Sequence, residues 1–326
     1  MTVATETEQE FLSAARQALR TDAHAAPAAL GWYDLLSQLD DPVARTAAFA
    51  LFRAQGRELA STHALGVLLA RPYLDATADP PDALVTCAVQ HPGGRAGRAI
   101  VVGGTGAGGL LVDVPGRGVA LVDPGRATLH VLELPGRLAL HEVEMVADTG
   151  ADRVPVDDAS LRHARARSRW LGRVALAAEI LGACERAVDV AVEYAKDRKQ
   201  FGEPIGRFQA VRHLLAWART ECVALEHVTR LGVSFGFDAP PHFDTVAKAL
   251  AGRNGRRACQ HTLQVLGAIG FTAEHEHHHV YGRVLLLDAL LGTSAELTHS
   301  LGAWLRDHGG DPGFTRAALR SSLVAP

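Results

Sequence analysis

The sequence predicts an α+β fold that is mainly α, with three regions in chain order. Residues 1–80 and 159–326 carry apolar side chains at helical spacing, whereas residues 81–158 carry short β-like runs separated by Gly, Pro and Asp. The chain has 326 residues, of which 48% are hydrophobic, so it can bury a large core. We expect an N-terminal helical domain, a middle β domain and a C-terminal helical bundle with these boundaries.

The first region has the signals of several helices. Residues 7–19 repeat apolar side chains at i, i+4 and i+8, and a break rich in Pro, Ala and Gly follows at 25–31. Asp41 followed by Pro42 is typical of a helix N-cap and first turn. The pattern predicts helices over residues 7–19, 32–39 and 42–70.

The middle region reads as strands that are joined by tight turns. Gly, Pro and Asp punctuate the runs, which is typical of a small antiparallel sheet or barrel. The predicted strands cover residues 83–89, 99–102, 109–114, 119–122 and 128–132.

One glycine motif in this region invites a nucleotide-binding interpretation. Gly104–Gly109 matches G-x-G-x-x-G, but a dinucleotide site also needs a helix directly after the motif. The next residues, 110–115, are β-like and end in proline. We therefore predict a hairpin at this point and no phosphate loop.

The third region predicts long helices. Residues 168–196 form an Ala-rich stretch in which Glu179, Arg186 and Glu193 recur every seven residues on a polar stripe. Further helices are predicted over residues 205–231, 244–267 and 281–306.

Residues Tyr194–Gln209 read Y-A-K-D-R-K-Q-F-G-E-P-I-G-R-F-Q, which resembles the signature of acyl-CoA dehydrogenases. Those flavoenzymes use FAD to oxidise the α,β bond of acyl-CoA thioesters. The resemblance implies an N-terminal helical domain, a small middle β domain and a C-terminal four-helix bundle. It also implies FAD as cofactor and an acyl-CoA substrate.

In that family, the signature Arg reaches across a subunit interface to the pyrophosphate of a neighbour's flavin. The matching residues are Arg198, with Phe201 packed nearby and Gln209 toward the adenosine end. A guanidinium suits this contact because it is always charged and can grip a pyrophosphate with two parallel bonds. An ordinary helix end, with Gly202 as terminator, is the alternative.

A second segment, residues 264–271, reads Q-V-L-G-A-I-G-F and resembles a family loop that receives the other subunit's pyrophosphate. Gln264, Gly267 and Ala268 are the matching contacts, and Ala268 stands where the family usually has Gly. Glycine lets a backbone approach a ligand closely. The alternative is a glycine cap at the end of the helix 244–266.

The chain departs from the family where a catalytic carboxylate is expected. Most members place Glu before a Gly-Thr pair; here Leu291 precedes Gly292 and Thr293. A minority place it early in the long helix, and the count reaches Gly172. Leucine and glycine cannot accept the α proton.

Other carboxylates are weak substitutes for that base. Glu179 belongs to the polar stripe, which favours a solvated or ion-paired role. Glu274 lies in the run Glu274–His279, where adjacent histidines cannot all face one ion, so we expect no metal site.

The flavin-lining segments of the family's β domain are also not visible. The chain thus keeps residues that reach into a neighbour's flavin and lacks those that hold its own. This pattern resembles the small subunit of actinobacterial α2β2 acyl-CoA dehydrogenases, in which a larger subunit carries the base. Such assemblies often oxidise CoA thioesters of steroid side chains, and an electron-transfer flavoprotein is the family's usual acceptor.

Two other functions stay open. The chain could be a self-sufficient homodimeric dehydrogenase whose base is Glu179 or Glu274, or a structural paralogue without catalysis. Composition argues against nucleic acid and membrane as partners. A net charge of −3 gives no positive field that would attract nucleic acid, and no apolar run is long enough to span a membrane. The four scattered cysteines predict buried thiols in a reducing cytoplasm.

Overall fold

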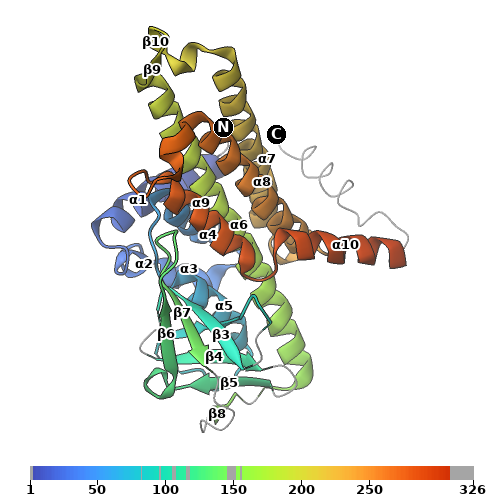
Figure 1. Cartoon of the computed structure of the whole chain (residues 1–326). Coiled ribbons are helices and arrows are strands. Elements are labelled where there is room, and N and C mark those ends of the chain that lie inside the picture. The colour runs from blue at the N-terminus through green and yellow to red at the C-terminus, as the bar shows by residue number, and fades with distance from the viewer. Residues whose placement is uncertain are drawn as a thin grey trace.

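The computed structural model describes residues 3–308 except 82, 95–96, 105–107, 115–117, 145–151 and 155. Helices precede and follow a small β region, and the long helices of the C-terminal region form one elongated bundle with the β region near one end (Figure 1). The predicted mainly helical α+β fold is therefore confirmed. Among the helices in these ranges, none has the length and apolar composition to cross a bilayer.

The N-terminal helices differ from prediction at one break. The expected helix over 42–70 is two helices, because Leu59 takes a left-handed φ of 51° and ends the first of them. The N–H of Leu59 donates to the carbonyl of Gly56, and the N–H of Ala60 donates to the carbonyl of Gln55. These bonds close the helix end without a glycine. The elements are α1 (Val3–Thr21), α2 (Ala26–Ala29), α3 (Trp32–Leu35), η1 (Leu36–Gln38), α4 (Pro42–Glu58) and α5 (Ala64–Asp75).

The β region consists of two four-stranded sheets. One has the order β1 (Val85–Cys87), β4 (Gly109–Val114), β5 (Gly118–Val122), β8 (Asp152–Arg153), and the other β2 (Val89–Gln90), β3 (Arg98–Val102), β7 (Leu140–Glu144), β6 (Thr128–Leu132). All described pairs are antiparallel except β1 with β4, which is parallel. A short helix, η2 (Pro124–Arg126), precedes β6.

The sheets correct the prediction for the glycine motif. Strands β3 and β4 flank it but belong to different sheets, so they do not form the expected hairpin. Residues 105–107 of the motif lie outside the described residues. A strand rather than a helix follows Gly109, in agreement with the rejection of a phosphate loop.

The C-terminal region is built on one very long helix. Its 40 residues begin ten residues earlier than predicted, because Asp157 accepts bonds from the N–H groups of Ala159 and Ser160 and caps the helix. The helices are α6 (Asp158–Asp197), α7 (Gln209–Phe235), α8 (Phe243–Leu266), α9 (His277–Ala289) and α10 (Ser294–His308), with short helices η3 (Ile205–Arg207), η4 (Gly236–Asp238) and η5 (Gly267–Phe271).

Helices α6, α7, α8 and α9 pack together, and α10 projects away from them (Figure 1). The predicted single helix over 281–306 is divided between α9 and α10. Leu291 and Gly292 take φ angles of 56° and 100°, which no α-helix accommodates. The chain therefore turns sharply between the two helices.

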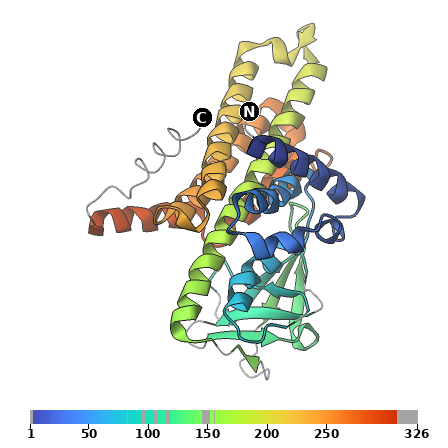
Figure 2. The same cartoon turned by 180° about the vertical axis from the view of Figure 1, so that it is seen from behind.

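The N-terminal helices lie against α6 in the reverse view (Figure 2). Two glycines let α4 approach α6 at backbone distance. A Cβ at Gly56 would stand 1.9 Å from the carbonyl oxygen of Glu179, and one at Gly182 would stand 1.9 Å from that of Arg53. Each helix thus supplies a glycine that faces the backbone of the other.

This close crossing predicts the effect of adding one methyl group. Gly56→Ala should lower the free energy of unfolding by about 3 kcal/mol, because neither backbone can yield without separating the helices. Gly302→Ala is the matched control: the site is exposed on α10 with no atom within 4 Å of the added Cβ, so a gain of up to about 1 kcal/mol is expected. Urea unfolding measures both, and equal stabilities would contradict the packing argument.

Candidate functional site

The signature segment forms one tip of the helical bundle. Helix α6 ends at Asp197, and a hairpin of β9 (Lys199–Gln200) and β10 (Glu203–Pro204) follows, at the far end from the sheets (Figure 1). Phe201 and Gly202 make the two-residue turn with φ angles of 55° and 85°, as a type I′ hairpin requires. Gly202 therefore serves this turn and does not end the helix.

The turn holds its aromatic residue out in solvent. Phe201 is 93% exposed, although its ring meets Phe208 edge-on with centroids 6.1 Å apart. Arg198 caps α6 through its N–H, which donates to the carbonyl of Tyr194, and its side chain is exposed. Its carbonyl accepts from the N–H of Ile205 at 2.8 Å, so the hairpin is fixed to the helix end while the guanidinium stays outside.

The second predicted segment ends α8 near the same tip. Gln264 is exposed in the last turn, and Gly267 takes a φ of 65° as the C-cap, with its N–H bonded to Leu263. The glycine cap is therefore present. A Cβ at Gly267 would meet no atom within 4 Å, so the backbone conformation rather than space favours glycine. Ala268 is exposed in η5.

A small apolar cluster brings the two segments together. It joins the end of α6, the start of α7 and the end of α8 through Ala191, Ala195, Ile205, Val211, Leu214, Leu215 and Val265. Gln209, exposed at the first position of α7, completes the set. Arg198, Gln209 and the loop after Gln264 thus share one end of the bundle.

Large apolar side chains are also exposed at this end. Phe271 is 75% exposed, and Phe208 and Ile269 are each more than a third exposed. The tip therefore combines the exposed amides of Gln209 and Gln264, the exposed guanidinium of Arg198 and exposed apolar side chains.

The two positions counted for the family's base lie against each other. A Cβ at Gly172 would stand 2.4 Å from Leu291 Cδ1 and 2.6 Å from Leu69 Cδ2. Residues 172 and 291 come from α6 and from the turn after α9, and only the fold brings them together. The side chains of Leu291 and Leu69 fill the space in front of Gly172.

Charged groups near this apolar spot are already engaged. Arg173 donates to the carbonyl of Leu291 at 3.1 Å and pairs with Asp244 at 2.8 Å. Lys248 is fully buried, and its ammonium donates to the carbonyls of Asp288 and Gly292 at 2.9 and 3.2 Å. Burial lowers the pKa of Lys248 to about 8. These contacts fasten the turn that carries residue 291.

Glu179 lies elsewhere, at a buried junction. Its carboxylate accepts from Arg283 Nε at 2.9 Å and from Gln55 at 3.4 Å. Glu179 is 2% exposed and Arg283 fully buried, so the carboxylate is ion-paired but not solvated as a polar stripe would imply. Burial raises the pKa of Glu179, whereas Arg283 and Gln55 act in the opposite direction by stabilising the carboxylate.

Sequence reasoning missed Arg283 and Lys248. Each is a lone cation in an otherwise apolar helical run, which is the signal that could have found them, because an isolated charge on a buried face needs partners. Their partners lie in other elements and could not be named from spacing.

The acidic and His-rich turn is divided between exposed and buried residues. Glu274 is exposed between η5 and α9, whereas Glu276 pairs with Arg186 at 2.6 Å. His277 is buried against the hydroxyl of Thr262, and burial lowers its pKa to about 4. Within the described ranges, no three His, Cys, Asp or Glu side chains form an arrangement that could hold a metal ion.

Comparison with known sequences is consistent with the signature. Residues 170–305 match the family model described as acyl-CoA dehydrogenase, C-terminal domain. The acyl-CoA dehydrogenase FadE34 of Mycobacterium tuberculosis is 33% identical over 60% of this chain and 25% of that protein. IpdE2 of the same organism is 36% identical over 39% of each chain. The chain therefore spans well under half the length of these relatives.

Solved structures share the fold. A variant of the steroid ACAD Tcur3481-Tcur3483 has a TM-score of 0.72 at 22% identity, over 95% of this chain and 100% of that one. The ChsE4-ChsE5 complex of M. tuberculosis has a TM-score of 0.69 at 18% identity, over 94% and 98%. A glutaryl-CoA dehydrogenase of Mycobacterium smegmatis, solved with FADH2, scores 0.66 at 14% identity, over 91% and 94%. Residues 170–305 are thus similar to the C-terminal domain of acyl-CoA dehydrogenases, and the solved structures share the fold of most of the chain.

The buried pair gives a test of what Glu179 does. Glu179→Gln keeps the shape but leaves Arg283 charged and unpaired, so the free energy of unfolding should fall by about 3–5 kcal/mol. Glu193→Gln, exposed on the same helix, should change it by less than about 0.5 kcal/mol. Denaturant titrations of both variants check this, and a Glu179→Gln protein as stable as the control would contradict a structural role.

Proposed function

We propose that this chain is the smaller, base-free subunit of an FAD-dependent acyl-CoA dehydrogenase, active with a larger subunit of the same family. The reaction is the α,β-dehydrogenation of an acyl-CoA thioester. The observation that carries the proposal is an asymmetry. Residues that match the family's flavin contacts are exposed together at one bundle tip, while leucine side chains pack at the two positions counted for the base.

The residues at the tip fit a pyrophosphate-bearing cofactor. Arg198 supplies a permanent positive charge that is free of protein carboxylates in the contacts described, and the amides of Gln209 and Gln264 supply donors. Gly267 leaves its surroundings open at the end of α8. When bound, FAD accepts the hydride that leaves the β carbon.

In the assembly, this chain's residues bind and position rather than move protons. Arg198 would hold the pyrophosphate, Gln209 and Gln264 would orient the adenosine side, and the exposed ring of Phe201 would pack against the partner. The α proton would be taken by a carboxylate of the larger subunit, because Gly172 and Leu291 offer none. Steps at the reacting carbons are thus assigned to the partner.

The self-sufficient alternative meets two obstacles. The Glu179 carboxylate is occupied by Arg283 and Gln55, and freeing it would leave a buried guanidinium without its partner. Glu274 is exposed in the turn between η5 and α9, so it is open to solvent and not enclosed in a site. A purely structural paralogue has no need for three exposed polar residues at the positions of flavin contacts.

The names of similar solved structures support a partner subunit and suggest a substrate class. Two of the similar structures are named as two-component proteins, and one is named a steroid ACAD. We therefore propose an α2β2 assembly and a CoA thioester with a steroid or similarly bulky acyl group. An electron-transfer flavoprotein is the proposed acceptor.

Purification of the chain alone and with its larger partner tests this function. The isolated chain should be colourless and inactive with acyl-CoA and a dye acceptor, and the co-expressed complex should be yellow and active. A yellow isolated chain that reduces the dye with acyl-CoA would contradict the proposal.

Arg198→Ala should weaken flavin retention by the assembled complex. The loss of one charge-assisted contact is worth about 1.5–3 kcal/mol, or roughly 10- to 150-fold in affinity. Arg306→Ala, an exposed arginine on α10, is the control and should retain full flavin content. The measurement is flavin absorbance per complex after dialysis. A flavin content of the Arg198→Ala complex equal to that of the unmutated complex would show that Arg198 does not contact the flavin.

A further inference from the structure

The histidine-rich turn before α9 is not used by the function proposed above. Helix α9 receives no side-chain cap from Glu276, its N-cap residue. A histidine supplies the missing bond, because His275 Nδ1 accepts from the N–H of His277 at 3.2 Å. Only a neutral imidazole offers this acceptor, since a protonated histidine donates through both nitrogens. The start of α9 is therefore capped by a group that cannot accept the bond once it is protonated.

A second histidine accepts a bond from the β region. The N–H of Gly136, in the loop before β7, donates to His279 Nδ1 at 3.5 Å, so this nitrogen also carries no proton. The rings of His278 and His279 lie 3.8 Å apart at their centroids, so a positive charge on both would be repulsive. Burial, His278 and Arg137 lower the pKa of His279.

A third histidine is enclosed between α9 and α8. His277 is 1% exposed, and its Nε2 lies 2.9 Å from the hydroxyl of Thr262. That hydroxyl donates to the carbonyls of Ala258 and Cys259, so Nε2–H is the donor to Thr262 and Nδ1 is unprotonated. A second proton would place a charge inside the bundle, at the positive end of α9. Burial is the main reason that the pKa of His277 falls to about 4.

The charges around these imidazoles do not favour protonation. Arg137, before β7, and Arg186, on α6, are cations close to the turn. Glu276 is the acidic neighbour, but Arg186 pairs with it at 2.6 Å. The other titratable groups here are Glu274, which is exposed in the turn, and Tyr281, whose ring meets the buried imidazole edge-on.

A series of bonds connects this turn to η5 at the bundle tip. The N–H of Thr272 donates to the carbonyl of Ile269 at 3.0 Å, and the N–H of His275 donates to that of Thr272 at 3.4 Å. His278 Nδ1 donates to the carbonyl of His275 at 2.7 Å. The loop that begins at Gly267 is thus joined to the first turn of α9.

We propose that residues 272–280 form an acid-sensitive switch. At neutral pH, the unprotonated imidazoles of His275, His277 and His279 hold the start of α9 against α8 and the β region. At mildly acidic pH, their protonation opens the first turn of α9 and releases η5. The switch is a property of the chain itself and does not depend on whether the tip binds a flavin.

Hydrogen exchange of the full-length chain at pH 7.5 and 5.0 tests the switch. The pKa of His277 is about 4 in the fold and about 6.5 for an exposed histidine, so the open form binds the proton first and opening increases as the pH falls. These two values predict that His277 alone raises the opening equilibrium of residues 277–281 about 30-fold, after correction for intrinsic exchange rates. Equal opening at both pH values would overturn the proposal.

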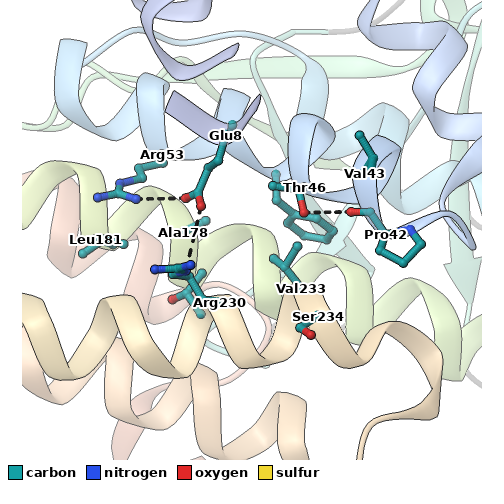
Figure 3. Close-up of a pocket in the computed structure, with 13 residues that line it drawn as sticks. Glu8, Pro42, Val43, Thr46, Arg53, Ala178, Leu181, Arg230, Val233 and Ser234 are labelled. Carbon is teal, nitrogen blue, oxygen red and sulfur yellow. Dashed lines mark hydrogen bonds and ion pairs between the residues drawn. The ribbon is translucent and has the colours of Figure 1, made fainter. Parts of the chain in front are cut away.

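Residues 46–54 of α4 are the internal reference. They are joined to α1 by the ion pair of Arg53 with Glu8 at 3.1 Å, and not by a histidine (Figure 3). Their opening should change by less than about twofold, because this pair contains no group with the ordinary pKa of histidine. An increase as large as that of residues 277–281 would mean general acid unfolding and would also overturn the proposal.

Two variants that keep the bonds assign the effect to the histidines. In His277→Gln, the amide still donates to Thr262 but takes up no proton, so the acid-induced increase should be at least about fivefold smaller. In His275→Asn, the side-chain oxygen replaces Nδ1 as acceptor, and the increase should be at least about twofold smaller. His227→Gln, exposed on α7, is the control and should retain the full increase. A full increase in His277→Gln, or in His275→Asn if the first variant does not fold, would overturn the proposal.

Discussion

The rest of the structure depends on the buried ion pair between Glu179 and Arg283. Arg283 of α9 donates to Glu179 of α6, to the carbonyls of Gly136 and Arg137 in the β region, and to that of Ala60 between α4 and α5. One guanidinium thus satisfies groups from all three regions of the chain. Because an unpaired buried charge is very costly, the three regions hold one relative arrangement.

This junction also engages a carboxylate that the sequence offered as a substitute base. Glu179 lies in the middle of the long helix α6, and its pair with Arg283 serves the fold. The place where the family's two base positions meet is filled by leucines instead, and its turn is fastened by Lys248 and Arg173. The residues predicted to contact the flavin are exposed around Arg198, at the end of the bundle away from the sheets (Figure 1). This arrangement agrees with the proposal that the chain completes a site on another molecule.

Much of the fold could be predicted because helical periodicity and turn residues act locally. The breaks after α4 and α9 could not be predicted, since Leu59 and Leu291 hold left-handed conformations that leucine rarely adopts and that the sequence does not signal. The strand after the glycine motif could be predicted, but the placement of its flanking strands in separate sheets could not, because strand pairing depends on residues far apart in the sequence. Glu179 shares a seven-residue spacing with half-buried Arg186 and exposed Glu193, yet it is buried because it pairs with Arg283, which lies 104 positions away in the sequence. The tip residues could be proposed from the sequence because their motif is contiguous, whereas the contact between 172 and 291 exists only in the folded chain.

The most direct test of the account is the structure of the flavin-loaded assembly, with the distance from the Arg198 guanidinium to the flavin pyrophosphate as the measurement. The account predicts nitrogen–oxygen distances of about 2.7–2.9 Å, with the isoalloxazine ring held by the larger subunit. A ring bound by this chain beside Gly172 and Leu291, with Arg198 far from any phosphate, would contradict it.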